Sequence, residues 1–171
     1  MERMKASLFL TVAFATVLQL SAMSVLLTLE QKVTWSSAVL RISISEATLV
    51  KGEFSGQIAV CKGAVVEVLK GQQGLTKVEF RVHPYGSLSP EELPGIVGKE
   101  FVVFLHQPPH GDGSTNEFWA LQGPQGVRAT TEKYEEYKIG ADGEITTETL
   151  GRTNFLAAIR GFVSKDKQGK K

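Results

Sequence analysis

The most regular pattern of hydrophobic and polar positions lies over Lys77–Val82, where charged and apolar residues alternate without a break. Successive side chains of a strand point to opposite faces of its sheet. This segment is therefore predicted to be an antiparallel strand with one buried face. The longer β-branched run over residues 58–69 predicts the main strand of the same sheet. Gly63, halfway along it, predicts a kink that lets the sheet curl.

Shorter apolar segments, separated by glycine, proline and polar residues, predict further strands. They cover residues 48–54, 100–106, 117–121, 127–130 and 134–139. The segment 100–106 has apolar residues on both faces, which is typical of a central strand or a barrel strand. Asp142-Gly143 is a hairpin-turn signal and predicts a last strand from Ile145. Residues 71–74 predict a turn, and residues 84–98 a loop with one helical turn near Pro90.

One amphipathic helix is predicted near the C-terminus. Thr153 or Asn154 can begin it, because such side chains accept hydrogen bonds from the free amides of a first helical turn. The apolar residues that follow recur at helical spacing and form one stripe, which consists of Phe155, Leu156, Ile159, Phe162 and Val163. Residues 164–171 are rich in lysine and predict a frayed basic tail.

The N-terminal segment has a different character. Arg3 and Lys5 precede an apolar run that carries no charge until Glu30, the pattern of an export signal or an N-terminal membrane anchor. Small residues at Ala22 and Ser24 predict cleavage before residue 25. The apolar run nevertheless continues to residue 29 and is long enough to span a bilayer. Both alternatives place the domain outside the cytoplasm, as a periplasmic, secreted or membrane-anchored protein.

The chain divides accordingly into four parts. Residues 1–29 form the signal peptide or anchor, and residues 30–46 a linker or peripheral strand. Residues 47–163 form the β domain, and residues 164–171 the tail. A length of 171 residues, with 42% hydrophobic and 22% charged residues, is typical of one globular domain.

Charge and cysteine content exclude some functions. Removing Glu2, Arg3 and Lys5 from the 19 basic and 18 acidic residues leaves 17 of each. A neutral domain lacks the basic surface that nucleic-acid binding requires, so no nucleic-acid partner is expected. Cys61 is the only cysteine, which excludes an internal disulfide. Because it lies in an apolar strand, we expect a buried and unreactive thiol.

The densest group of potential metal ligands consists of His106, His110 and Asp112. Imidazole and carboxylate groups suit zinc or another transition metal. Two prolines separate the histidines, so the spacing of a helical metal motif is excluded, and a solvated loop between two strands is the alternative. No cofactor is predicted, since the sequence has no phosphate loop, dinucleotide fingerprint or zinc-protease motif.

Phe118 and Trp119 are the candidate binding surface, because OB-type barrels often contact their ligands through one face. Neighbouring residues of a strand point to opposite faces, so only one of the two can point inward. The paired carboxylates at residues 91–92 and 135–136 are interpreted as solvated surface residues rather than as acid–base pairs.

Short strands curled by glycines and followed by one helix predict a mainly β fold. The expected form is a small OB-like antiparallel β-barrel with a C-terminal amphipathic helix. Residues 64–71 (Ala-Val-Val-Glu-Val-Leu-Lys-Gly) and 98–105 (Gly-Lys-Glu-Phe-Val-Val-Phe-Leu) resemble strands of small exported bacterial domains of uncharacterised function. The layout also resembles the OB-type barrel of tissue inhibitors of metalloproteinases and netrin-like modules.

These features predict an exported β-barrel module that binds a protein or an envelope component, rather than an enzyme. Inhibition of a secreted hydrolase is an alternative implied by the resemblance. The tissue inhibitors act through a disulfide-tethered N-terminal cysteine, however, and this chain has no cysteine there. A metal-dependent enzyme that uses the loop from His106 to Asp112 is the second alternative.

Overall fold

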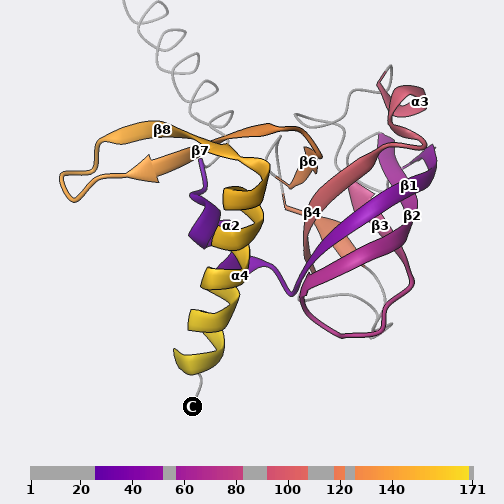
Figure 1. The fold of residues 1–171 in the computed structure, drawn as a ribbon. Helices are drawn as coiled ribbons and strands as arrows, with labels where there is room; N and C mark the ends of the chain where they lie inside the picture. The colour runs from indigo at the N-terminus through magenta and orange to yellow at the C-terminus, as the bar shows by residue number, and fades with distance from the viewer. Residues whose placement is uncertain (1–25, 52–56, 83–91, 108–117, 122–125, 170–171) are drawn as a thin grey trace, which may run out of the picture.

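Eight strands and three helices make up the part of the chain that the computed structural model describes, which is residues 26–51, 57–82, 92–107, 118–121 and 126–169. The fold is mainly β and ends in a helix, as predicted (Figure 1). In chain order the elements are α2 (Leu29–Trp35), β1 (Ala38–Lys51), β2 (Gln57–Lys70), β3 (Lys77–Val82), α3 (Leu93–Ile96), β4 (Glu100–His106), β5 (Phe118–Ala120), β6 (Val127–Ala129), β7 (Lys133–Ile139), β8 (Ile145–Gly151) and α4 (Arg152–Gly169).

The first five strands pair with one another in a closed ring. Strand β1 pairs with both β2 and β4, β2 pairs with β3, and β5 joins β3 to β4. Strand β6 pairs with the first half of β4, and β7 and β8 form a separate hairpin. The β3–β5 pairing is parallel, so the prediction of an antiparallel arrangement is wrong at this pairing. The ring brings strands that are far apart in the sequence side by side (Figure 1).

Strand β1 is a single strand of 14 residues, where the sequence predicts a linker or peripheral strand up to residue 46 and a separate strand from residue 48. Its register against β2 shifts at three places, and the last shift, between Ile44 and Glu46, lies where the two predicted segments meet. Gly63 of β2 lies opposite Ile44, beside one of these shifts. A Cβ atom at Gly63 would lie 2.8 Å from the carbonyl oxygen of Ser43, so the close approach of the two strands requires glycine.

Two hydrophobic clusters share the strands of the ring. The inner cluster fills the inside of the ring, and the outer cluster lies outside it, under α2, α4 and the β7–β8 hairpin. Strand β4 contributes to both. Phe101, Val103 and Leu105 belong to the inner cluster, and Val102 and Phe104 belong to the outer one. The prediction that both faces of β4 are apolar and buried is therefore confirmed.

Helix α4 packs its apolar stripe onto the outer cluster, where Phe155 is fully buried. Tyr134 of β7 stacks on Phe155, with the ring centroids 3.9 Å apart. The predicted hairpin and helix are confirmed, but the helix begins at Arg152, so Thr153 and Asn154 lie within its first turn rather than before it. The prediction of a frayed tail is wrong for residues 164–169, which continue the helix. Within them the Asp166 carboxylate lies 2.9 Å from the Lys70 ammonium, so the last turns are held against β2.

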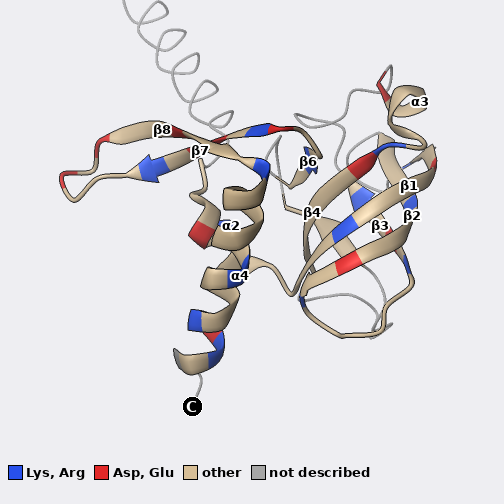
Figure 2. Ribbon diagram, viewed as in Figure 1, with Lys and Arg blue, Asp and Glu red and all other residues tan. Residues whose placement is uncertain are grey.

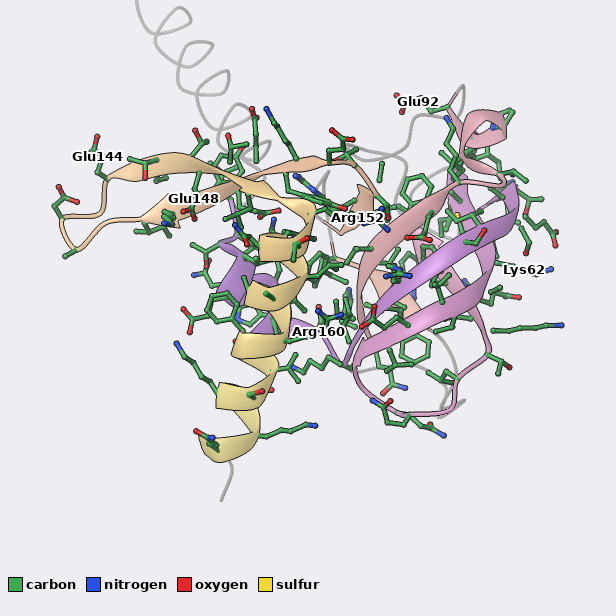
Figure 3. The ribbon with its side chains drawn as sticks, viewed as in Figure 1. Lys62, Glu92, Glu144, Glu148, Arg152 and Arg160 are labelled. Atoms are coloured by element: carbon green, nitrogen blue, oxygen red, sulfur yellow. The ribbon has the colours of Figure 1, made fainter. Side chains whose placement is uncertain are left out.

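A network of alternating charges joins α4 to the ring. Glu100 Oε1 lies 3.2 Å from Nη2 of Arg152, and Glu67 Oε1 lies 2.6 Å from Nη2 of Arg160. Arg41 of β1 lies between these carboxylates, at 3.1 Å from Glu100 and 3.2 Å from Glu67. Figure 3 labels the two arginines on α4. The network therefore fixes the orientation of α4 on the outside of β1, β2 and β4.

The first described residues of the domain belong to the segment that the sequence predicts to be a signal peptide or anchor. Leu27 and Leu29 are buried in the outer cluster. Thr28 and Gln31 form a capping box at the start of α2, in which each side chain accepts a hydrogen bond from the other residue's backbone N–H. Residues 1–25, which carry most of the predicted signal or anchor, lie outside the described residues. Among the described residues, no helix is long and apolar enough to cross a membrane.

Candidate binding face

The helices cover only part of the outer surface of the ring. In the described part of the chain, their main contacts with the ring are with β1, β2 and β4 rather than with β3 or β5. The outward side of β3, β5 and the part of β2 that pairs with β3 consists of polar, small and half-buried residues. We call this surface the β3 face and define it by Val60, Lys62, Ala64, Lys77, Glu79, Arg81 and Trp119.

One row of side chains crosses the β3 face from strand to strand. Val60 pairs with Arg81, Arg81 pairs with Trp119, and Trp119 pairs with His106. Directly paired residues point to the same side of a sheet, so the four side chains follow one another across β2, β3, β5 and β4. The guanidinium carbon of Arg81 lies 5.7 Å from the centre of a Trp119 ring, a cation–π contact. The row therefore places a half-buried aromatic ring in contact with a positive charge on the outside of the strands.

A hollow of about 520 Å³ lies next to this row on the same strands. Its floor is formed by residues with small or no side chains, and charged residues of β2 and β3 surround them. The lining consists of Ser45, Lys62, Gly63, Ala64, Lys77, Val78 and Glu79. Gly63 in this lining is the same glycine whose Cβ atom would lie 2.8 Å from the carbonyl oxygen of Ser43 on β1.

The charges around the hollow are mixed in sign. Lys62 Nζ donates a hydrogen bond of 3.1 Å to Glu46, and Figure 3 shows the Lys62 side chain extending away from the ring. This hydrogen bond and the attraction of the Glu46 carboxylate raise the pKa of Lys62 above its ordinary value. Figure 2 shows acidic and basic residues interspersed over the strands of the ring. The face is thus suited to a partner with groups of both signs.

The predicted metal ligands are only partly placed. His106 ends β4 and lies next to Trp119 in the row described above. His110 and Asp112 lie outside the described residues. Among the described residues, no three histidine, cysteine or acidic side chains gather as a metal site would require. The structure therefore places His106 beside Trp119, at the border of the β3 face, and the metal site stays a prediction.

Phe118 and Trp119 point to opposite sides of β5. Phe118 packs against the inner cluster and pairs with buried Phe80. Trp119 lies on the outside against Arg81. Of the two predicted surface residues, only Trp119 is therefore positioned to contact a partner, and Phe118 contributes to the core.

Cys61 is fully buried in the inner cluster and forms no disulfide, as the sequence predicts. Burial raises the pKa of its thiol to about 11. At pH 8 the reactive thiolate is then about one in a thousand of the population, since each pH unit below the pKa lowers it tenfold.

We therefore expect the native protein to resist alkylation at Cys61. Treatment with iodoacetamide at pH 8 should leave the native chain unmodified and modify it fully in 8 M urea, as measured by mass spectrometry. The urea sample is the control for reagent activity. Equal rates of modification in both samples would contradict the placement of Cys61 in the core.

A buried ion pair lies on the side of the ring opposite the β3 face, inside the outer cluster. Lys32 of α2 and Glu136 of β7 are both buried, and the ammonium donates a hydrogen bond to Oε2 of the carboxylate. Arg128 lies 3.6 Å from Oε1 of Glu136, and Phe104 places its ring 6.0 Å from the ammonium. Burial lowers the pKa of Lys32, and Glu136 opposes that shift. The interpretation of residues 135–136 as solvated is wrong for Glu136. It lies on the same face of β7 as Tyr134, and these two side chains contact α2 and α4 respectively.

Comparison of the chain with protein-family models and with curated proteins finds no match. Function is therefore inferred from the residues themselves. The resemblance to exported domains and to inhibitor barrels remains a proposal.

Proposed function

We propose that the chain is an exported, non-catalytic β-barrel module of the OB-like type, which binds a protein or another component of the cell envelope through its β3 face. The OB-type barrel has five strands and binds ligands on the face of its second and third strands. Three features support this assignment: the ring order β1–β2–β3–β5–β4, the parallel β3–β5 pairing, and the short helix α3 between β3 and β4.

The observation that carries the proposal is the row from Val60 to His106 beside a hollow. Tryptophan and arginine are the residues that most often dominate the binding energy of protein interfaces. Here Trp119 and Arg81 are in contact with each other on the outside of the ring. The adjoining hollow offers a place for a protruding side chain or sugar ring, and its mixed charges favour polar recognition at the edge.

Export is supported by the N-terminal sequence. Arg3 and Lys5 precede an apolar run, and among the described residues the first apolar residue of the core is Leu27. A targeting segment that ends before Leu27 leaves the outer cluster intact. Cleavage before residue 25 and retention as an anchor both satisfy this condition.

Filling the hollow tests the proposal. Ala64→Tyr places a large side chain on the exposed floor of the hollow, and tyrosine is favourable in strands, so the variant should fold. Thr149→Tyr is the matched control, because Thr149 is an exposed strand residue of β8, away from the hollow.

We expect tagged wild-type protein to capture the same envelope component as Thr149→Tyr, and Ala64→Tyr to capture at least tenfold less. The measurement is quantitative mass spectrometry of material retained from solubilised envelope of the producing cells. Equal capture by Ala64→Tyr would show that the β3 face is not the binding surface. Turnover of a substrate without any captured component would overturn the binding function itself.

A further inference from the structure

One face of the β7–β8 hairpin is left open by the helices in the described part of the chain. Tyr134 and Glu136 lie on the other face, where they contact Phe155 of α4 and Lys32 of α2. Figure 1 shows that the hairpin extends beyond both helices, so its end is not covered by them. Successive side chains of a strand alternate between the two faces. We call the open face the outer hairpin face and define it by Glu135, Tyr137, Ile139, Ile145, Thr147 and Thr149.

Two large apolar side chains at the end of this face are exposed. Ile139 is 49% exposed and Ile145 is 53% exposed, and the two residues are directly paired. Directly paired residues lie on the same side of a sheet, so the two isoleucines form one apolar patch. Tyr137 lies two residues before Ile139 and continues the patch along β7. Contiguous exposed apolar side chains of this kind mark a contact surface rather than an ordinary solvated one.

The start of the described chain adds another exposed apolar residue to the same face. Thr28 pairs in parallel with Tyr137, so their side chains leave the same side of the hairpin. Leu26 precedes Thr28 by two residues and is 38% exposed, whereas Leu27 between them is buried in the outer cluster. This alternation is that of a strand, and it places Leu26 on the outer hairpin face. The apolar residues of the face thus continue from Leu26 past Tyr137 to the two isoleucines.

The charges of the outer hairpin face do not favour an anionic partner. Glu135 is the only charged residue among the six that define the face. The turn at the end of the hairpin adds two exposed acidic residues, Asp142 and Glu144, and Figure 3 labels the second of them. Attraction to anionic lipids requires clustered lysine or arginine side chains. The face is therefore suited to a surface that offers apolar and neutral polar groups.

The predicted targeting segment leads directly into this face. Residues 6–25 carry no charge and have the length of about 20 predominantly apolar residues that a bilayer-spanning helix requires. Leu27 and Leu29, which follow in the same apolar run, are already buried in the domain. Only Leu26 therefore separates a retained anchor from the core, and Leu26 lies on the outer hairpin face. An anchor so closely joined brings this face to the surface of the bilayer.

We propose that residues 6–25 are retained as a membrane anchor and that the outer hairpin face lies on the bilayer, with Ile139 and Ile145 among the lipid headgroups. The proposal rests on the export and membrane targeting of the proposed function. Apolar side chains gain free energy on leaving water, and tyrosine is enriched at membrane interfaces. Because the anchor holds the face at a high effective concentration near the lipid, a small patch is sufficient. The anchor and the hairpin together fix the orientation of the domain on the membrane.

Fluorophores on two neighbouring residues of β8 test the proposal. Ile145→Cys places a thiol on the outer hairpin face, and Thr146→Cys places one on the opposite face, where Thr146 is also exposed. Each variant is labelled with an environment-sensitive fluorophore, and the full chain is reconstituted into phosphatidylcholine vesicles. Cys61 is buried, and labelled wild-type protein measures its background. The measurement is the loss of emission when the vesicles contain phosphatidylcholine with a nitroxide near the top of one acyl chain.

We expect the fluorophore at position 145 to lose at least half of its emission and the fluorophore at position 146 to lose almost none. Adding Ile139→Asp to Ile145→Cys should reduce the quenching at least twofold, because a carboxylate is unfavourable against lipid. Val97→Asp is the matched control, since Val97 is a large apolar residue that is also exposed but lies beside α3. It should leave the quenching at position 145 unchanged.

Three results would overturn the proposal: no quenching at position 145, equal quenching at positions 145 and 146, or a mature chain that begins at Val25 in the producing cells, as measured by mass spectrometry. The Ile139→Asp variant should still capture the envelope component from solubilised envelope, and Ala64→Tyr should leave the quenching at position 145 unchanged. These two variants therefore distinguish failure of the membrane contact from failure of the β3 face.

Discussion

Lys32→Met is expected to destabilise the folded protein by about 3–5 kcal/mol, because it leaves the Glu136 carboxylate buried without its closest cation. Both side chains are almost completely removed from solvent, so water cannot take over the lost interaction. Arg128 lies farther from the carboxylate and already donates a hydrogen bond to the Glu135 carbonyl. The free energy of unfolding from urea denaturation at pH 7 measures the effect.

Removing both charges should destabilise the folded protein far less than removing Lys32 alone. In Lys32→Met with Glu136→Leu, apolar side chains of similar size replace the pair, and such replacements are often neutral or stabilising. The control is Lys138→Met, which removes one partner of a pair that is largely exposed and should cost at most about 1 kcal/mol. A Lys32→Met loss as small as that of the control would contradict the burial of the pair. A double variant less stable than Lys32→Met would do so as well.

Gly126→Ala is expected to destabilise the protein by about 3 kcal/mol or more, because the new methyl group has no space. Its Cβ atom would lie 2.0 Å from the carbonyl oxygen of Leu121 and 2.8 Å from the Leu121 nitrogen. These are backbone atoms and cannot rotate away. Phe104 donates to the Gly126 carbonyl and accepts from the Leu121 N–H, so any separation also breaks pairing with β4.

The matched control is Gly161→Ala on α4. A Cβ atom at Gly161 meets nothing within 4 Å, and alanine is a better helix former than glycine. We expect this variant to be more stable than the wild type by about 0.5–1 kcal/mol. Urea midpoints of the two variants measured together test the prediction. A Gly126→Ala midpoint equal to that of the wild type would show that the Leu121 backbone does not lie against Gly126.

The sequence predicts the strands in which the pattern of apolar and polar residues continues without interruption. Lys77–Val82 and Glu100–His106 are found within the predicted bounds, because their patterns reflect burial on one face and on both faces. For strand β1, the sequence predicts a strand of the domain from residue 48 and a linker or peripheral strand before residue 46, and the register shift between Ile44 and Glu46 lies where these two segments meet. Helix α2 is not predicted, although Thr28 and Gln31 have the spacing of a capping box, because the apolar run before it has the pattern of a targeting segment.

The candidate sites depend on contacts that no local pattern contains. Arg81 and Trp119 meet through a parallel pairing of β3 and β5, and this register is not encoded in either strand alone. Lys32 and Glu136 lie 104 residues apart. The period of two in β7 places Glu136 on the same face as buried Tyr134, a signal from which the burial of the carboxylate could be predicted. Its partner could not be predicted in this way.

The central claim is that the β3 face contacts a component of the cell envelope. Photochemical cross-linking in the producing cells tests it most directly, with a photoreactive phenylalanine analogue in place of Lys77, at the edge of the hollow. Lys133 is the matched control position, because it is also an exposed lysine at the start of a strand, on β7. We predict one discrete cross-linked product from position 77 and none from position 133. No product from position 77, or the same product from both positions, would contradict the claim.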